Sequence, residues 1–208
     1  MLRTKTAKGK TFAGGAMFAP RVKAGKYKVK ITKGADVFEK EIEVQYDPKS
    51  PFTLEERTPQ QKTTVELYNF NQELAYFVYE LDKWDASVKG FLNENSAPNK
   101  AAQALSKELD NLRDKMVITK GDNYVGAGEP RLREKLGDIY STIGSYYGAP
   151  SSTQLENITM LRNTFNEGKA QFEKMKTSTI KAFEKELVKK SKTSPKILSF
   201  EEFLKSEN

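Results

Sequence analysis

The chain has 208 residues, of which 37% are hydrophobic and 30% are charged, and its net charge is +7. It contains no cysteine and no histidine, which excludes disulfides, thiolate nucleophiles, zinc–thiolate sites and the most common general base. No stretch approaches the roughly 18 consecutive apolar residues of a membrane-spanning helix. We therefore expect no catalytic residues, no metal ligands and no cofactor in this chain, with carboxylate chemistry as the one enzymatic route left open.

The basic residues are concentrated at the two ends of the sequence. Residues 1–33 hold ten Lys or Arg and no acid, and residues 169–208 hold ten basic and six acidic residues. The section between them, residues 34–168, holds fifteen basic and twenty-two acidic residues. The basic start suggests an anionic surface or nucleic acid as one possible partner.

A β-hairpin is predicted between Gly25 and Tyr46, because apolar and charged residues alternate along two segments. Gly34 and Ala35 fit the two-residue loop of a type II′ turn. This register places opposite charges across the strands, which stabilises a sheet by a few tenths of a kcal/mol per pair. The expected pairs are Lys30 with Glu39, Lys28 with Glu41, Lys26 with Glu43, Ile31 with Phe38, Tyr27 with Ile42 and, less favourably, Val29 with Lys40.

A further strand is expected between Thr11 and Val22, interrupted by Gly14 and Gly15 at a bulge or turn. Three or four strands in residues 1–50 are too few for a two-sheet sandwich, which usually needs about seven. We therefore expect residues 1–50 to form a small partial immunoglobulin-like β unit. Its inner face is expected to be covered by the helices or, as we favour, by strands upstream in a longer parent protein in which Met1 is not the natural start.

Asp47 to Pro51 marks a boundary, after which the apolar period becomes helical. Thr58 is expected to cap the first helix, with Pro59 as its first residue. An unbroken heptad stripe then predicts helix packing over more than three heptads. This stripe consists of Leu67, Phe70, Leu74, Phe77, Leu81, Trp84, Val88 and Phe91.

Three further apolar stripes complete the predicted bundle. The second helix carries Ala101, Leu105, Leu109, Leu112 and Met116, and the third carries Leu132, Leu136, Ile139, Ile143 and Tyr147. The fourth is capped by Ser151 or Ser152 and carries Leu155, Ile158, Leu161, Phe165, Phe172, Met175, Phe183 and Leu187, with Gly168 at a close approach or weak point. The fold class is therefore α+β, mostly α: the partial β unit precedes an antiparallel four-helix bundle over 51–195, with long first and last helices, and a polar tail over 196–208. In this tail, Leu198, Phe200 and Phe203 are suited to docking a short helical turn on the bundle.

Some residue groups have a chemical and a structural explanation, and we favour the structural one in each case. The loop Gly126 to Gly128 precedes a helix, as phosphate-binding loops do, but it lacks the preceding strand, the third glycine and the Walker lysine. Aromatic side chains could form a platform for a sugar or a nucleobase, but aromatic residues at helical spacing usually belong to a core. These are Tyr140, Tyr146, Tyr147 and Trp84.

Acidic and basic residues of the hairpin also fit a plain sheet surface. Glu39, Glu41 and Glu43 resemble a set of catalytic carboxylates or calcium ligands, but in the predicted register they face a row of lysines. The same glutamates neutralise the basic start, and lysine outnumbers the phosphate-binding arginine there. We therefore do not expect nucleic acid to be the partner.

Two segments of the sequence resemble a known family. Ala24 to Ile31 (AGKYKVKI) and Phe38 to Pro48 (FEKEIEVQYDP) are similar to the C-terminal region of bacterial sortilin-like β-propeller proteins, which carry BNR repeats and are often labelled glycosyl hydrolases. In that family a strand of the form P-G-x-Y-x-V-x-L precedes a second strand ending in D-P and a helical segment. The elements at Phe18 to Pro20, Glu129 to Leu132, Tyr140 and Gly148 to Pro150 also fit, whereas Ala24 replaces the usual proline.

The resemblance implies that this chain is the C-terminal part of a larger exported protein, periplasmic, cell-surface or secreted, with a β-propeller on its N-terminal side. The first residues, Met1 to Thr6, lack the apolar region of a secretory signal. Our first hypothesis is a non-catalytic accessory or protein-interaction module whose partner is a protein or the adjacent propeller. One alternative is a supporting region of a glycosidase-type enzyme with its active site in that propeller. Another is a basic protein that binds nucleic acid or a membrane surface.

Overall fold

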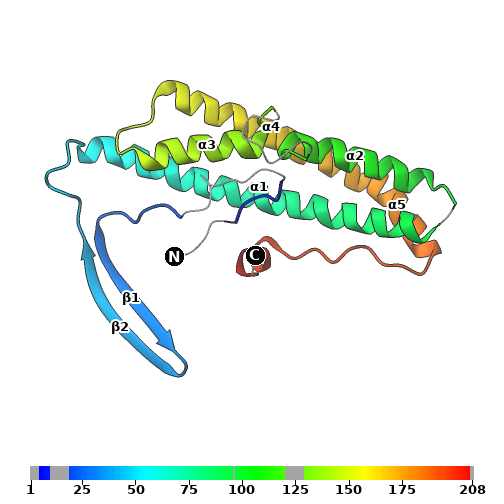
Figure 1. Cartoon of the computed structure of the whole chain (residues 1–208), viewed down its shortest axis with the longest axis horizontal. Helices are drawn as coiled ribbons and strands as arrows, with labels where there is room; N and C mark the ends of the chain where they lie inside the picture. Colours follow the sequence, from blue (N-terminus) through cyan, green and yellow to red (C-terminus); the bar gives the residue numbers. More distant parts are fainter. Residues whose placement is uncertain (1–4, 10–18, 96, 120–128, 207–208) are drawn as a thin grey trace.

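The computed structural model describes residues 5–9, 19–95, 97–119 and 129–206, and shows a β-hairpin that projects from one end of an elongated helical bundle (Figure 1). The chain is α+β and mostly α, as the sequence predicts. The elements in chain order are β1 (Gly25–Lys33), β2 (Asp36–Val44), α1 (Leu54–Glu94), α2 (Lys100–Met116), α3 (Leu132–Ser145), α4 (Ser152–Thr177), α5 (Thr179–Lys189) and α6 (Phe200–Lys205).

The hairpin has the predicted register. Strands β1 and β2 are antiparallel, and each of the six pairs expected from the sequence is present. Gly34 has a φ of +62° and Ala35 has no positive φ, as a type II′ turn requires. A lysine–glutamate ion pair joins diagonal neighbours, with 3.2 Å between Lys28 Nζ and Glu39 Oε2. Lys40 lies opposite Val29 without penalty because both residues are exposed.

The expected strand between Thr11 and Val22 lies mostly outside the described residues. Its last part, residues 19–22, is described and is not a strand. Within the described residues the sheet consists of β1 and β2 alone. The immunoglobulin-like unit expected from the sequence is therefore represented there by one hairpin.

The bundle is organised around α1, which runs along its full length (Figure 1). The shorter helices α2 and α3 both pack on α1 and have few contacts with each other, so they follow one another back along it. Helices α4 and α5 then run in the direction of α1 and pack on α3 and α2. The expected helical segments are thus present. They form three antiparallel rods: α1 alone, α2 followed by α3, and α4 followed by α5. None of the helices in the described part of the chain is both long and apolar enough to cross a bilayer.

The predicted stripes form the core of this bundle. Every residue of the α1 stripe is buried, and Phe70, Phe77 and Phe91 meet aromatic rings of α4 and α5 at centroid distances of 5.3–5.6 Å. The other stripes shift at their ends. Ala102 replaces Ala101, Tyr140 is more deeply buried than Ile139, and Leu155 is exposed because the first turns of α4 extend beyond the core.

The first helix begins earlier than the sequence predicts. Its N-cap is Thr53, not Thr58, and Pro59 lies inside the helix. A capping box explains the earlier start: the Thr53 amide donates to Glu56 Oε2 at 2.8 Å, and the Glu56 amide donates to Thr53 Oγ1 at 3.3 Å. The hydrogen bonds from Thr53 also lower the pKa of Glu56 from its ordinary value. Pro59 therefore costs one backbone hydrogen bond but does not stop the helix.

The fourth predicted helix is divided at Ser178 into α4 and α5, because the backbone of Ser178 leaves the helical conformation. At the other end of this helix the predicted cap is confirmed, since Ser151 caps α4 and its side chain accepts from the Gln154 amide at 3.2 Å. Gly168 marks a close approach of α4 to α2. A Cβ atom there would lie 2.8 Å from Cε of Met116.

The C-terminal segment returns along α1 and docks on it through aromatic side chains. The Tyr76 hydroxyl donates to the Leu198 carbonyl at 2.9 Å, and the Phe203 ring lies 5.6 Å from Tyr76 and 5.0 Å from Tyr79. Lys5 lies over the Phe203 ring and donates to the Ser206 carbonyl at the end of α6. The segments near the two chain ends are therefore in contact.

Candidate binding site

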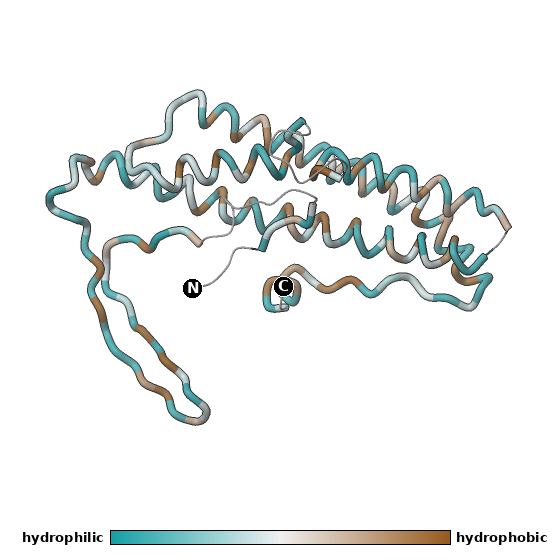
Figure 2. The backbone as a smooth tube through the Cα atoms, viewed as in Figure 1, coloured by the Kyte–Doolittle hydropathy of each residue, from teal (hydrophilic) through white to brown (hydrophobic). Residues whose placement is uncertain are grey.

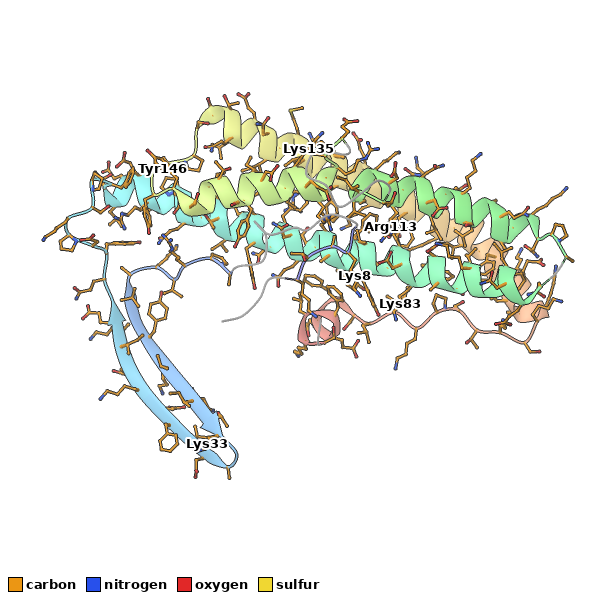
Figure 3. All side chains as sticks on the ribbon, viewed as in Figure 1. Lys8, Lys33, Lys83, Arg113, Lys135 and Tyr146 are labelled. Atoms are coloured by element: carbon orange, nitrogen blue, oxygen red, sulfur yellow. The ribbon has the colours of Figure 1, made fainter. Side chains whose placement is uncertain are left out.

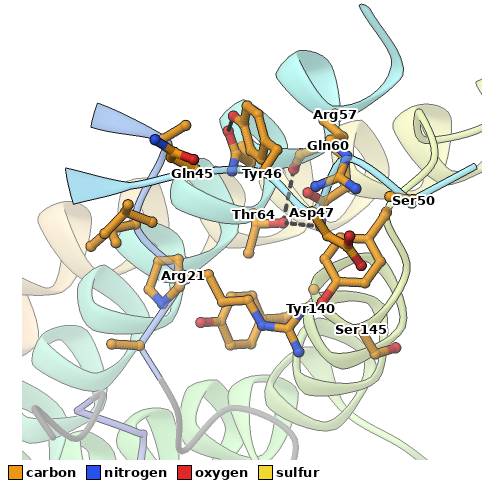
Figure 4. Close-up of a pocket in the computed structure, with 18 of the residues that line it drawn as sticks. Arg21, Gln45, Tyr46, Asp47, Ser50, Arg57, Gln60, Thr64, Tyr140 and Ser145 are labelled. Carbon is orange, nitrogen blue, oxygen red and sulfur yellow. Dashed lines mark hydrogen bonds between the residues drawn. The ribbon is translucent and has the colours of Figure 1, made fainter. Parts of the chain in front are cut away.

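A cavity of about 800 Å³ lies where the hairpin joins the bundle (Figure 4). Its walls come from four separate segments: residues 19–24 before β1, residues 44–50 at and after the end of β2, the first turns of α1, and the end of α3 with Tyr147 beyond it. The volume lies within the range of roughly 300–1,000 Å³ typical of small-molecule sites.

Polar residues of α1 form the floor of this cavity. Arg57, Gln60 and Thr64 continue the core stripe of α1 toward its N-terminus at steps of three and four, and all are buried. Gln60 Nε2 donates to the Ile143 carbonyl at 2.7 Å, which ties α1 to the end of α3. The Thr64 hydroxyl donates to the Gln60 carbonyl at 2.8 Å. Residues at apolar stripe positions are polar here, so the core ends in a polar cavity at this end of the bundle.

Arg57 is held in a fixed position although none of the described carboxylates pairs with it. Its side chain is 7% exposed, and its guanidinium lies 4.9 Å from the ring centroid of Tyr46 and 5.1 Å from that of Tyr147. Its Nε donates to the Phe52 carbonyl at 3.4 Å. The rings stabilise the cation through cation–π attraction. No described carboxylate forms an ion pair with Arg57, and its terminal nitrogens have no hydrogen-bond partner among the described residues.

A second arginine approaches the same tyrosine. The guanidinium of Arg21 lies 4.9 Å from the ring centroid of Tyr147 and donates to the Tyr147 hydroxyl. Figure 4 shows that Arg57 enters from α1 and Arg21 from the segment before β1. The four side chains thus alternate as Tyr46, Arg57, Tyr147 and Arg21. We call this group the arginine–tyrosine cluster.

One carboxylate lies on the cavity wall. Asp47 lines the cavity, and its Oδ1 accepts from the Lys49 amide at 2.9 Å, the bond that shapes the turn after β2. The charged side chains of the lining are therefore Arg21, Arg57 and Asp47, and their sum is one positive charge. Such an arrangement is suited to holding a monovalent anion.

The hairpin offers a second surface, which is apolar. Tyr27, Val29, Ile31, Phe38 and Ile42 share one face of the strands, and Figure 2 shows hydrophobic residues alternating with hydrophilic ones there. Ile31 is 61% exposed and Phe38 is 60% exposed. In Figure 1 the hairpin extends away from the helices, so none of the helices in the described residues covers this face.

The residues singled out in the sequence are dispersed in the structure. Trp84 is buried in the core, whereas Tyr140 and Tyr147 line the cavity and Tyr146 packs edge-on against Phe52 at 5.1 Å. Tyr147 is not a core residue because α3 ends at Ser145. Glu39, Glu41 and Glu43 lie on the charged hairpin face opposite lysines. The loop Gly126 to Gly128 lies outside the described residues.

The basic side chains of the described residues are spread over separate parts of the molecule. In Figure 3 Lys33 lies at the hairpin tip, whereas Lys8 lies beside Arg113, whose Nη2 donates to the Lys8 carbonyl at 3.3 Å. In the described ranges no group of three acidic side chains is placed to hold a metal ion. The sequence analysis missed Arg21 and Arg57 as site residues. The one local signal was the run of polar residues at the stripe positions of α1.

Comparisons with known proteins found no matching family model, no matching curated protein and no matching solved structure.

Proposed function

We propose that this chain is a non-catalytic protein-interaction module and that its hairpin docks on an adjacent β domain. The observation that carries this proposal is the exposure of the hairpin on both faces. An isolated two-stranded hairpin is at best marginally stable in water, and a third strand or a packed layer is usually needed. An exposed sheet edge also presents unpaired backbone donors and acceptors to a neighbouring strand.

The chemistry of the hairpin defines the surface that it fits. Ile31, Phe38 and Ile42 expose 44–61% of their surface on one face, and burying the part still exposed contributes about 1–2 kcal/mol each, roughly half the value for a fully exposed side chain. The opposite face pairs lysines with glutamates, and residues 25–44 hold five lysines and four carboxylates. This near balance gives an anionic partner little attraction. The surface therefore fits an apolar, β-structured protein face.

The resemblance to sortilin-like proteins supports an adjacent β-propeller as this domain. In that arrangement the chain is the C-terminal accessory part of an exported protein at the cell envelope or outside the cell. The glycosidase-type alternative requires catalytic carboxylates in the same propeller, and it leaves the role of the hairpin unchanged. In both hypotheses, the accessory module and the support of a glycosidase, the function of this chain is thus to bind the propeller.

The first test is the mass of the natural protein, measured in its source cells with an antibody against this chain. We expect a polypeptide well above 23.5 kDa that contains a β domain. Hydrogen exchange then compares that polypeptide with the 208-residue chain. The amides of residues 25–44 should exchange rapidly in the short chain and slowly in the long one.

Two neighbouring residues give a matched pair of variants for the long polypeptide. Phe38 and Val37 are both exposed, by 60% and 51%, but they lie on opposite faces of β2. We expect Phe38→Ser to abolish the hairpin protection and Val37→Ser to preserve it. Equal protection in both variants, or a natural protein of 23.5 kDa, would contradict the proposal.

A further inference from the structure

The cavity at the base of the hairpin suggests a function separate from protein docking. We propose that the arginine–tyrosine cluster binds the carboxylate group of a small molecule and that the remaining cavity holds an apolar or aromatic body attached to it. The proposal rests on the geometry of Arg57, on the charge of the lining and on the size of the cavity.

Arg57 has the geometry of a preorganised carboxylate receptor. The Tyr46 and Tyr147 rings flank its guanidinium, and the Phe52 carbonyl occupies its Nε–H. The terminal nitrogens remain as hydrogen-bond donors, and Arg57 lines the cavity. A planar guanidinium with donors free matches the two oxygens of a carboxylate. The two rings and the Phe52 carbonyl offset only part of the cost of burying this cation, and no described carboxylate pairs with it, so an anion at the terminal nitrogens would stabilise it further.

The charge of the lining selects a monoanion. Arg21 and Arg57 contribute two positive charges and Asp47 contributes one negative charge. A carboxylate brings the total to neutrality, whereas a phosphate dianion would exceed it. The donors come from side chains of separate segments, without the run of backbone amides that typically cradles a phosphate.

The cavity is much larger than a carboxylate group. Its volume of about 800 Å³ accommodates a drug-sized molecule, and its walls include Val22, Val44 and the ring of Tyr140. Aromatic and aliphatic walls stabilise a body of the same kind. Gln60 and Thr64, which are fixed by hydrogen bonds to each other and to α3, provide polar contacts at the floor.

The test is a titration of the 208-residue chain followed by NMR, with ligands that differ in one property. N-acetylphenylalanine carries a carboxylate beside an aromatic ring, and its carboxamide has the same body without the charge. We expect saturable shifts with the acid at millimolar concentration and none with the amide. The shifts caused by inorganic phosphate should not reach saturation over the same concentration range. Phenylpropionate, which lacks a peptide group, should bind like the acid if the site takes small molecules rather than the end of a peptide chain.

Variants locate the binding site. Arg57→Gln should weaken the binding of N-acetylphenylalanine by at least about tenfold, since a hydrogen-bonded charge pair is lost. Arg57→Lys keeps the positive charge but loses the planar pair of guanidinium donors, so it should also bind the acid more weakly than the wild type does. Arg162 is the matched control, because it also stacks on an aromatic ring, 3.7 Å from Phe70, but is paired with Glu73. Arg162→Gln should bind normally.

Three results would overturn the proposal: equal binding of acid and amide, stronger binding of phosphate than of the acid, or unchanged binding in both Arg57 variants. The comparison of acid with amide uses the wild-type chain alone. It therefore decides the question even if Arg57→Gln fails to fold, which circular dichroism would reveal.

Discussion

Single polar residues decide where the core of α1 ends. The apolar stripe from Leu67 onward continues upstream as Thr64, Gln60 and Arg57, which are buried but hydrogen-bonded or stacked. The sequence therefore contains the signal for a polar cavity at this end of the bundle. It does not contain the partners, because Tyr46 reaches Arg57 across the turn after β2 and Tyr147 reaches it from beyond the end of α3.

Glu80 is a second polar residue at the edge of the core. Burial is the main cause that raises the pKa of Glu80 from its ordinary value, and nearby Lys176, 3.9 Å away, acts in the opposite direction. A raised pKa means that the folded state holds this proton more tightly than the unfolded state. The contribution to stability is therefore present at acidic pH and is lost as the pH rises through the folded-state pKa.

We expect Glu80→Gln to raise the melting temperature at neutral pH by at most about 3 °C and to leave it unchanged at acidic pH. Calorimetry at both pH values measures the difference. Glu173→Gln is the control, because Glu173 binds the same lysine at 2.8 Å but is mostly exposed. A lower melting temperature of Glu80→Gln at neutral pH would mean that the attraction of Lys176 outweighs burial.

Gly168 lets α4 approach α2. Two substitutions distinguish the effect of side-chain volume on stability from the effect of helix propensity. Alanine gains up to about 1 kcal/mol over glycine in a helix but must displace the flexible end of Met116, so Gly168→Ala should be within about 1 kcal/mol of the wild type. Gly168→Leu should cost about 1–3 kcal/mol through overpacking. Urea unfolding measures both.

The double variant Gly168→Leu, Met116→Ala checks this explanation of the Gly168 prediction. Removing the Met116 side chain provides space for the leucine, so the double variant should lose less stability than the sum of the two single changes. Additive losses would show that the backbone of α4, rather than Met116, opposes the larger residue.

At the scale of elements, the sequence predicts those features that depend on residues close together in the chain. Alternating Lys and Glu together with Gly34 define one hairpin register, and the structure has it. The start of α1 was misplaced because Pro59 is a strong local signal, whereas the capping box of Thr53 and Glu56 outweighs it. The stripes of α2 and α3 predict two helices but not their order along α1, since that order depends on which surface each stripe meets.

The docked C-terminal segment gives a prediction for α6. Phe203 lies between Tyr76, Tyr79 and Lys5, so Phe203→Ala should release the segment from α1. Trypsin should then cleave at Lys192 and Lys196 about tenfold faster or more, because cleavage follows the population of the undocked state. Mass spectrometry of the fragments measures the rate.

The same release should change the ionisation of Tyr76. Burial is the main cause that raises the pKa of Tyr76 from its ordinary value, so this pKa should fall in Phe203→Ala. The difference in ultraviolet absorbance at high pH between Phe203→Ala and the wild type follows it, because the other eight tyrosines are common to both chains. Glu201→Ala is the control, because Glu201 is exposed on the same helix. Unchanged cleavage in Phe203→Ala would show that Leu198 and Phe200 hold the segment without it.

At the scale of the whole molecule, the hairpin and the bundle are nearly independent. The strands bury none of their apolar side chains against the helices, whereas the C-terminal segment packs on α1. Replacing residues 27–42 by a short Gly-Ser turn should therefore change the melting temperature of the helices by less than about 2 °C. Far-UV circular dichroism measures it.

A truncation before Leu198 is the matched control for the hairpin deletion. It removes the hydrogen bond to Tyr76 and the rings that pack on α1, so it should lower the melting temperature by several degrees. A large loss on removing the hairpin would mean that the bundle depends on it after all.

The contact between Lys5 and Ser206 has a topological consequence. With 3.2 Å between Lys5 Nζ and Ser206 Oγ, a side chain from each end of the described chain is within hydrogen-bond distance of the other. A short linker could join the two ends into a ring, and new termini could then be opened at Gly34 and Ala35, at the tip of the hairpin. Such a circular permutant would keep the order of the helices, while β1 and β2 would be joined by their strand pairing alone.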